Sequence, residues 1–322
     1  MRIVITDCDH ESTALEHEVA ASAGHELVVA SARSEDEVIA AAQGAAAMVV
    51  QYAPITRRVI KALPDLRVIG RYGVGYDTVD LEAATAKSIA LCNVPDYGTE
   101  DVSDHAIALA LSLARAIPRL DSAVRRGQWS LAAAGPMHRF SARVFGVLGL
   151  GAIGAATARK AAGLGFAVIG FDPAHEVGTV TSSGVQVVSL EDLALRADIL
   201  SIHVPLNRAT RHLVDAAFLG RMKRDALLVN TCRGPVIDTV ALVAALRDRP
   251  LGGAALDVFE EEPLPFDAAL RSLDNVILTP HAAWYSEESY AELKRRAIEN
   301  VCAVLDGRTP RNIVNPTVLE KK

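Results

Sequence analysis

The feature that most constrains the fold is an alternation, along the whole chain, of short apolar runs rich in β-branched residues with alanine-rich stretches of helical composition. Most apolar runs are continuous, as expected when helices cover both faces of a parallel sheet. The sequence therefore predicts a doubly wound α/β fold, with two such units. The expected strands are 2–6, 26–30, 46–50, 66–70 and 88–92 in the first unit, and 142–150, 166–172, 197–204, 225–231, 252–258 and 275–280 in the second.

Length and composition indicate a globular protein with two domains. A chain of 322 residues is long for a single hydrophobic core. Half of the residues are hydrophobic and 22% are charged, which is typical of globular proteins. The longest uncharged stretch, 38–56, contains glutamine, glycine and proline, so it predicts a helix end, a turn and a buried strand rather than a membrane span.

Charge and cysteine usage exclude several further classes. Asp7 and Asp9 come too early for the N-terminus to form a signal-peptide core. The four cysteines lie far apart, which disfavours a metal site or a disulfide framework and fits a reducing cytoplasm. The formal charge is −6 and no basic run is present, so nucleic acid is disfavoured as a ligand. A cytoplasmic protein without a metal, nucleic-acid or membrane partner is expected.

Several helices can be placed from their ends. Ser-x-x-acid capping patterns predict helix starts at Ser34 and Ser189. The segment 99–119 begins with an acidic turn and is then apolar on most faces, so we expect a linker helix buried at a domain or subunit contact. The segment 286–307 predicts an amphipathic helix with Gly307 at its C-terminal end.

A glycine-rich motif of the form GxGxxG runs from Gly149 to Gly154. It follows the expected strand 142–150 and opens the helical stretch 155–165, which is the context of a dinucleotide-binding loop. The glycines of such a loop allow a tight turn and the close approach of a pyrophosphate to the N-terminus of the helix. The alternative is a turn that only packs a helix on a sheet.

Asp172 extends this interpretation to the identity of the dinucleotide. It ends the next expected strand, 23 positions after Gly149 and close to the roughly 20 that the motif requires. A carboxylate there accepts hydrogen bonds from a ribose diol and repels a 2′-phosphate, so NAD is favoured over NADP. Because the motif lies near the middle of the chain, the cofactor domain is expected to be inserted into the other domain.

Further chemically active side chains follow the later strands. Arg233, Asp257 and His281 each stand at or just beyond the end of an apolar run. Glu262 follows Asp257 and precedes a proline. Ligands of parallel sheets bind beyond the carboxyl ends of the strands, so these side chains are expected to face one crevice. Taken singly, Arg233 could be a surface ion pair, Glu262 one of three solvated acids, and His281 a satisfied core histidine.

This set of residue types suits hydride transfer to a 2-oxo acid. The reaction needs a cation for the carboxylate and carbonyl of the substrate, and arginine supplies a permanent charge in a fork geometry. It also needs an acid for the developing alkoxide, and a histidine held by a carboxylate can supply that proton. We therefore favour a joint catalytic role for Arg233, Glu262 and His281.

At these motifs the chain resembles the D-isomer-specific 2-hydroxyacid dehydrogenases, over nearly its whole length. The blocks that carry the resemblance are GRYGVGYDTVDLEAATAKSIALCNVP (70–95), GVLGLGAIG (146–154), LLVNTCRGPVID (227–238), GGAALDVFEEEP (252–263) and ILTPHAAW (277–284). The resemblance implies an NAD-binding Rossmann domain, 99–285, inserted into a discontinuous flavodoxin-like substrate domain formed by 1–98 and 286–322. It also implies NAD-dependent reduction of 2-oxo acids to D-2-hydroxy acids.

The resemblance also assigns roles to individual residues. Arg233 would bind the carboxylate and carbonyl of the substrate, His281 would be the acid/base, and Glu262 would hold His281. Asp257 would contact the nicotinamide amide. The implied cofactor-binding residues are Val102, Gly149, Gly151, Ala152, Ile153, Gly154, Asp172, His203, Val204, Pro205, Thr210, Thr231, Cys232, Asp257, His281 and Ala283, and the implied substrate-binding residues are Gln51, Tyr52, Arg71, Val74, Gly75 and Trp284. Val74 and Gly75 would offer backbone N–H groups to the substrate carboxylate.

Within the family, the sequence HAAWYSE is most similar to the C-terminal-binding-protein branch, in which Arg71 and Trp284 would line the substrate pocket. Trp284 would offer a flat apolar wall, which suggests a medium-sized or sulfur-containing 2-oxo acid. The alternative for Trp284 is packing at a domain interface. The long C-terminal tail of animal corepressors is absent, so a transcriptional role is not expected.

Other activities fit the sequence less well. A phosphoglycerate dehydrogenase would place basic side chains where this chain has 51–54, and a non-catalytic NADH sensor would not need Arg233, Glu262 and His281. A related enzyme acting on another substrate such as phosphonate stays open. We also expect domain closure at hinges near Gly98 and Trp284, and a homodimer because of the apolar surface of the 99–119 helix.

Overall fold

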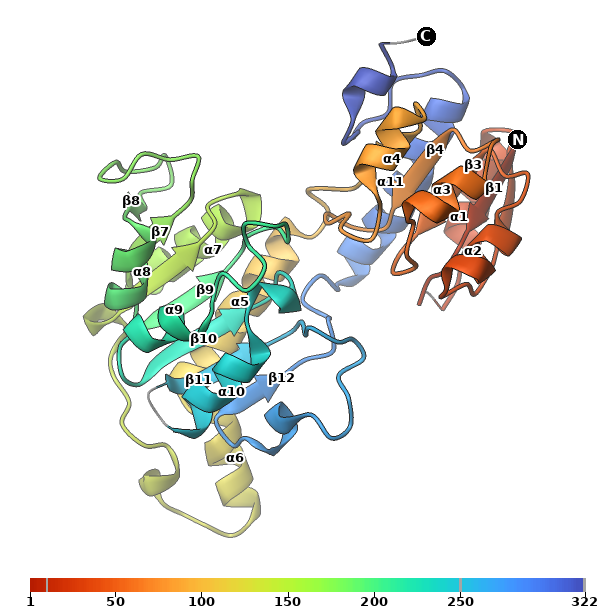
Figure 1. Cartoon of the computed structure of the whole chain (residues 1–322). Coiled ribbons are helices and arrows are strands. Elements are labelled where there is room, and N and C mark those ends of the chain that lie inside the picture. The colour runs from red at the N-terminus through yellow and green to blue at the C-terminus, as the bar shows by residue number, and fades with distance from the viewer. Residues whose placement is uncertain (10, 249–250, 321–322) are drawn as a thin grey trace. The chain divides into compact units, whose positions relative to one another are not determined.

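The computed structural model describes residues 1–9, 11–248 and 251–320. The chain divides into two compact units (Figure 1). Unit 1 consists of Met1–Tyr97 and Ser286–Lys322, and unit 2 consists of Gly98–Tyr285. The chain thus leaves unit 1 after its first segment, completes unit 2, and returns to finish unit 1.

The described part of unit 1 is built around a five-stranded parallel sheet in the order β2-β1-β3-β4-β5. This 2-1-3-4-5 order is that of flavodoxin-like folds. Its elements are β1 (Arg2–Ile5), α1 (Ala14–Ser22), β2 (Glu26–Val29), α2 (Glu35–Ala41), β3 (Ala47–Val50), α3 (Arg57–Ala62), β4 (Val68–Arg71), α4 (Leu81–Ala86), β5 (Ala90–Cys92), α11 (Glu287–Leu305) and the 3-10 turn η5 (Pro316–Val318).

Helices on both faces of this sheet explain why its strands are continuously apolar. Met48, Val50 and Ile69 pack into one core cluster with residues of α2, α3 and α4. On the other face α1 packs against α11, which also contacts β3, β4 and β5. The approach of α11 is close, since a Cβ at Gly70 would lie 2.7 Å from Val301 Cγ2. The last helix is therefore an integral part of the first unit.

Unit 2 contains, in its described part, a seven-stranded parallel sheet in the order β12-β11-β10-β9-β6-β7-β8. The order reverses between β6 and β9, which is the switch point where doubly wound folds bind ligands. Its elements are α5 (Thr99–Ala114), α6 (Ile117–Arg125), η1 (Leu131–Ala133), η2 (Phe140–Ala142), β6 (Val144–Leu148), α7 (Ala152–Gly163), β7 (Ala167–Phe171), β8 (Gln186–Val187), α8 (Leu190–Arg196), β9 (Ile199–Ile202), α9 (Ala216–Arg221), β10 (Ala226–Asn230), η3 (Gly234–Val236), α10 (Thr239–Arg247), β11 (Leu251–Leu256), η4 (Ala269–Ser272) and β12 (Val276–Leu278).

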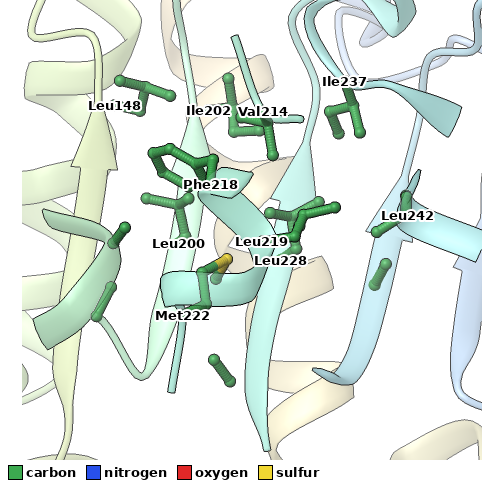
Figure 2. Packing of buried hydrophobic residues seen from close by; sticks show 14 of the residues in the cluster. Leu148, Leu200, Ile202, Val214, Phe218, Leu219, Met222, Leu228, Ile237 and Leu242 are labelled. Carbon is green, nitrogen blue, oxygen red and sulfur yellow. The ribbon is translucent and has the colours of Figure 1, made fainter. Parts of the chain in front are cut away.

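Two apolar clusters fix this sheet from its two faces. On one face Leu200 and Leu228 of the sheet meet Phe218, Leu219 and Met222 around α9 (Figure 2). The other cluster joins residues of α5 and α7 to the alternate side chains of β6, β9, β10 and β11. The strand ends that carry the predicted site residues are thereby held in a rigid frame.

The predicted fold is confirmed: each of the eleven expected strands is present, with its ends within two residues of the expected ones. The short strand β8 was not predicted. The helices expected to begin at Ser34 and Ser189 do begin there, with both serine side chains acting as caps. The C-terminal helix also ends as expected, with Gly307 in the left-handed conformation (φ 74°).

The prediction of one continuous helix over 99–119 is wrong. The chain forms α5 and then α6, with Ala116 between them in the left-handed region (φ 51°). Pro118 lies in the first turn of α6, where its missing N–H is no loss, whereas inside a longer helix it would break a hydrogen bond. The apolar face of α5 packs in the core of unit 2 itself, through residues such as Ala106 and Ala110. None of the described helices is long and apolar enough to cross a membrane.

Candidate active site

The glycine-rich loop connects β6 to α7, and its three glycines serve different purposes. Gly149 has φ 95°, and a Cβ on it would lie 2.7 Å from His203 O. A Cβ on Gly154 would lie 1.9 Å from Gly149 O, so only glycine allows the helix to approach this closely. Gly151, at the N-terminus of α7, has no atom within 4 Å of such a Cβ. The space before the free N–H groups of α7 therefore suits an anionic group.

Asp172 lies directly after β7, beside this loop. Its Oδ2 accepts a hydrogen bond from Leu150 N at 2.8 Å, and its Oδ1 accepts one from Ala174 N at 2.9 Å. The carboxylate is thus held by backbone groups at the same edge of the sheet as the helix N-terminus. This placement fits a partner for the ribose of a dinucleotide.

Most other predicted cofactor residues also follow strand ends of unit 2. Thr231 comes directly after β10, and its Oγ1 is buried without a hydrogen-bond partner among the described residues. His203 follows β9, with Nε2 2.8 Å from Ser201 Oγ, and burial lowers its pKa to about 4. Thr210 instead ties its own turn, since its hydroxyl donates to Pro205 O at 2.6 Å. A bound NAD would use the buried Thr231 hydroxyl and the open N-terminus of α7 as hydrogen-bond donors.

The remaining predicted cofactor residues lie on α5, in the first turn of α7 and after the strands β9 to β12. Val102 is buried on α5. Ala152 and Ile153 form the first turn of α7, and Val204 and Pro205 lie after β9. Cys232, Asp257 and Ala283 follow β10, β11 and β12, respectively. In the described ranges no group of His, Cys, Asp or Glu side chains could hold a metal ion.

His281 and Glu262 form a direct pair. His281 Nδ1 lies 2.6 Å from Glu262 Oε2, and Glu262 Oε1 accepts a hydrogen bond from Phe259 N at 2.8 Å. Burial acts to raise the pKa of Glu262, but the hydrogen bond and charge of His281, with a smaller effect of Arg233, outweigh it and leave this pKa below its ordinary value. Glu262 therefore stays ionised beside the imidazole.

Arg233 is brought to the same place by the loop after β10. Its charge acts on the Glu262 carboxylate, although the two residues are distant in the sequence. Its carbonyl accepts a hydrogen bond from Asn230 Nδ2 at 2.9 Å, which fixes the turn. The next residue is Gly234, where a Cβ would overlap the backbone of Phe259 at 1.8 Å. Glycine thus lets the Arg233 loop and the Glu262 loop approach each other closely.

The Asp257 carboxylate has a structural task that the sequence did not reveal. It is fully buried and accepts hydrogen bonds from Thr279 Oγ1, Ala282 N and Ala283 N, at 2.6 to 2.9 Å. His105 of α5 extends this network, with Nε2 3.1 Å from Thr279 Oγ1. The contact of Asp257 with the nicotinamide amide stays a prediction. The signal for His105 was weak, because a histidine on an apolar helix is usually a core residue.

Glu260 is another residue whose structural role the sequence did not reveal. Its carboxylate lies 2.5 Å from His212 Nε2 and accepts a hydrogen bond from Thr239 N. Burial acts to raise the pKa of Glu260, and the bonds from Thr239 and His212 reverse this and lower it. Glu260 thereby joins the loop before α9 to the start of α10.

The predicted substrate residues of unit 1 lie in two loops after β3 and β4. Arg71 ends β4, and its guanidinium donates to Tyr72 O. Val74 is 37% exposed, and its carbonyl accepts a hydrogen bond from Asn93 Nδ2. The loop is thus tied by its carbonyl groups. The substrate contacts of Arg71, Val74 and Gly75 stay predictions.

The loop after β3 is held by Asp7, a residue that was not singled out. The Asp7 carboxylate is buried and accepts hydrogen bonds from the backbone N–H groups of Gln51, Tyr52 and Ala53. The Gln51 side chain is only 4% exposed and accepts a hydrogen bond from Asp9 N. Gln51 therefore serves the loop itself, and its substrate contact remains untested. The signal for Asp7 was its place directly after an apolar strand.

Trp284 lies at the end of unit 2, next to the point where the chain enters it. A Cβ on Gly98 would lie 3.7 Å from Trp284 Cβ, so the two connections between the units run side by side there. The Trp284 and Tyr285 rings meet edge to face, with centroids 5.8 Å apart. Whether Trp284 also forms a substrate wall stays a prediction.

Comparison with known proteins agrees with this geometry. Residues 107–283 match the family model described as D-isomer specific 2-hydroxyacid dehydrogenase, NAD binding domain. A glyoxylate reductase of Korarchaeum cryptofilum is 41% identical over 270 residues, which cover 83% of this chain and 81% of that protein. The crystal structure of the TT0316 protein from Thermus thermophilus is similar with a TM-score of 0.88 and 33% identity, over 98% of this chain and all of that one.

A second solved structure, D-lactate dehydrogenase from Aquifex aeolicus complexed with NAD and lactic acid, has a TM-score of 0.87 and 26% identity, covering 97% of this chain and 99% of that chain. The chain therefore belongs to the D-isomer specific 2-hydroxyacid dehydrogenase family. It is an NAD-dependent oxidoreductase that reduces 2-oxo acids to D-2-hydroxy acids.

Proposed function

We propose that His281 is the general acid of the reduction and the general base of the reverse reaction. The observation that carries this proposal is the 2.6 Å contact between His281 Nδ1 and Glu262 Oε2. Because Nδ1 is engaged by the carboxylate, the proton passes between Nε2 and the substrate oxygen. Glu262 holds the imidazole ring and fixes which nitrogen faces the substrate.

Arg233 binds the carboxylate and the carbonyl oxygen of the 2-oxo acid in this proposal. NADH, which the 149–154 loop and Asp172 would hold, would supply the hydride that C2 of the substrate accepts. As the C2–O π electrons move to oxygen, His281 donates its proton there, and the products are a D-2-hydroxy acid and NAD⁺. The guanidinium stabilises the negative charge that develops on the oxygen. Support comes from the contact of His281 with Glu262 and from the effect of the Arg233 charge on the same carboxylate.

The substrate class is inferred from the residues that the family resemblance implies for substrate binding. The backbone N–H groups of Val74 and Gly75, with Arg71, bind the substrate carboxylate, and Trp284 provides an apolar wall for its side chain. This set favours a medium-sized or sulfur-containing 2-oxo acid over glyoxylate. The resemblance of HAAWYSE to the C-terminal-binding-protein branch supports it.

A substrate panel tests this proposal. NADH oxidation is followed with pyruvate, phenylpyruvate, hydroxypyruvate, glyoxylate and 4-methylthio-2-oxobutyrate, and the best substrate is repeated with NADPH. We expect the highest kcat/KM with a substrate that has an apolar side chain, and a preference for NADH. A best rate with glyoxylate, the substrate in the name of the Korarchaeum cryptofilum relative, would contradict the assignment of Trp284.

We also propose that the enzyme is a cytoplasmic homodimer. Support for the dimer lies in α6 and the segment after it, where Trp129 is 92% exposed and Leu131 is 80% exposed. Figure 1 shows this part of unit 2 extending from one end of the unit. Large apolar side chains exposed on one projecting segment are typical of a protein contact. The cytoplasmic location is supported by the wide spacing of the four cysteines.

A further inference from the structure

A chain of hydrogen bonds ties α5 to the loop that carries His281. It runs from His105 through the hydroxyl of Thr279 to the carboxylate of Asp257. His105 Nε2 lies 3.1 Å from Thr279 Oγ1, which lies 2.6 Å from Asp257 Oδ1. The Asp257 side chain is fully buried, whereas that of His105 is 26% exposed. A residue of a helix thus reaches the catalytic loop 174 positions further along the chain.

The direction of each hydrogen bond follows from the chemistry of the partners. Both oxygens of Asp257 act as acceptors, because they also receive the N–H groups of Ala282 and Ala283. The hydroxyl hydrogen of Thr279 therefore points to Asp257. Thr279 Oγ1 can then only accept from His105, so His105 Nε2 carries a hydrogen. His105 is the outermost donor of an ordered chain.

The inner end of this chain fixes the backbone of His281. Asp257 O accepts a hydrogen bond from His281 N at 2.8 Å, while the Asp257 carboxylate holds the next two N–H groups. His281 has φ 54°, a left-handed conformation that is strained for residues other than glycine and persists only where neighbours hold it. Asp257 provides the bonds that hold this turn, and Thr279 and His105 fix Asp257.

We infer that His105 and Thr279 are positioning residues for the reaction. They act through Asp257 to hold the left-handed turn that presents the His281 imidazole, and neither touches the substrate. This inference rests on the proposed role of His281. A displacement of about 1 Å at a catalytic group can lower a rate by about 100-fold, so residues that only hold such a group can control turnover.

Paired variants test the inference. His105→Leu and Thr279→Val remove the donor and the hydroxyl, whereas His105→Gln and Thr279→Ser keep them. We expect kcat at saturating NADH and 2-oxo acid to fall about ten-fold or more in the Leu and Val variants, and to be largely recovered in the Gln and Ser variants. The dissociation constant of NADH, measured by fluorescence, should stay within about two-fold, because no direct cofactor contact is removed.

A double variant separates this chain from general damage to the fold. Once Thr279→Val has removed the hydroxyl, adding His105→Leu should lower kcat little further, because both changes break the same chain. Losses that multiply, or weakened NADH binding with unchanged kcat, would overturn the inference. So would wild-type turnover in both single variants. If His281→Ala itself keeps full turnover, the proposed acid/base role fails, which is a distinct result.

Discussion

At the scale of single residues, the site depends on how Glu262 is kept charged. Its carboxylate is about one-third exposed, and its lowered pKa comes from His281 and Arg233 acting against burial. A carboxyl group whose pKa is lower in the folded state contributes stability above its unfolded pKa, near 4.3. That contribution is lost as pH falls through the folded value. At neutral pH the pair is therefore intact.

Replacing Glu262 by glutamine keeps the shape of this side chain and removes its charge. We expect a lower kcat for reduction, because the neutral amide no longer holds the imidazole as the charged carboxylate does. Initial rates of NADH oxidation at neutral pH measure this. An unchanged rate would show that the carboxylate does not act on His281. The neighbouring Glu261→Gln is the matched control and should behave as wild type.

Asp172 gives a second prediction at this scale. Asp172→Asn keeps an oxygen that can accept from Leu150 N or Ala174 N, but removes the charge that repels a 2′-phosphate. The ratio of kcat/KM with NADH to that with NADPH should fall by about ten-fold or more. Steady-state kinetics with both cofactors provide the ratio. If it does not change, cofactor choice is set elsewhere.

The sequence predicted Arg233, Glu262 and His281 because each follows an apolar strand and parallel strands end at one edge. It could not predict their supports. Thr279 and Asp257 are 22 positions apart, and His105 is 174 positions from Thr279, so only the folded chain brings them together. Glu260 was hidden for a related reason, since its partner His212 is 48 positions away.

At the scale of elements, strands were easier to predict than the limits of helices. Buried parallel strands leave a continuous apolar run, whereas β8 has two residues, one of them the exposed Gln186, and leaves no such signal. The break between α5 and α6 depends on the left-handed Ala116, and in the sequence only Pro118, two residues later, marks it. The glycine-rich loop was recognisable because its spacing is imposed by contacts between backbones.

The glycines of this loop give a contrasting pair of variants. Gly154→Ala places a Cβ 1.9 Å from Gly149 O and should lower the free energy of unfolding by about 3 kcal/mol. Gly151→Ala meets no protein atom within 4 Å, so its melting temperature should be unchanged. Its NADH affinity should nevertheless fall about ten-fold, because the methyl group occupies the space in front of the α7 N-terminus.

Thermal unfolding and NADH titration of both variants measure the difference. A Gly151→Ala protein that binds NADH like wild type would place the pyrophosphate elsewhere. A Gly154→Ala protein of unchanged stability would contradict the close packing of α7 on the loop.

At the scale of the whole molecule, the chain builds one unit from its two ends and the other from its middle. The sequence indicated this because the cofactor motif lies far from the N-terminus. The sequence predicted a homodimer from the apolar surface of the 99–119 helix. This reason does not hold, because the apolar face of α5 is buried in unit 2. Support for a dimer comes instead from the exposed residues after α6.

Charged substitutions test the dimer. Trp129→Asp and Leu131→Asp, at side chains 92% and 80% exposed, should convert a dimer of 34.2 kDa chains into monomers with little change in unfolding of the single chain. Val240→Asp, at a residue 81% exposed on α10, is the control and should leave the mass unchanged. Light scattering at working concentration gives the mass. A wild-type monomer would end the proposal.

The central claim is that His281, held by Glu262, gives its proton to the substrate oxygen. The most direct measurement is a single turnover, in which wild type or His281→Ala bound to NADH is mixed rapidly with the best 2-oxo acid and the loss of NADH absorbance is followed. We expect a rate lower by about 10²–10⁴-fold in the variant, with the NADH dissociation constant within about two-fold of wild type. An equal rate in the two proteins would contradict the claim.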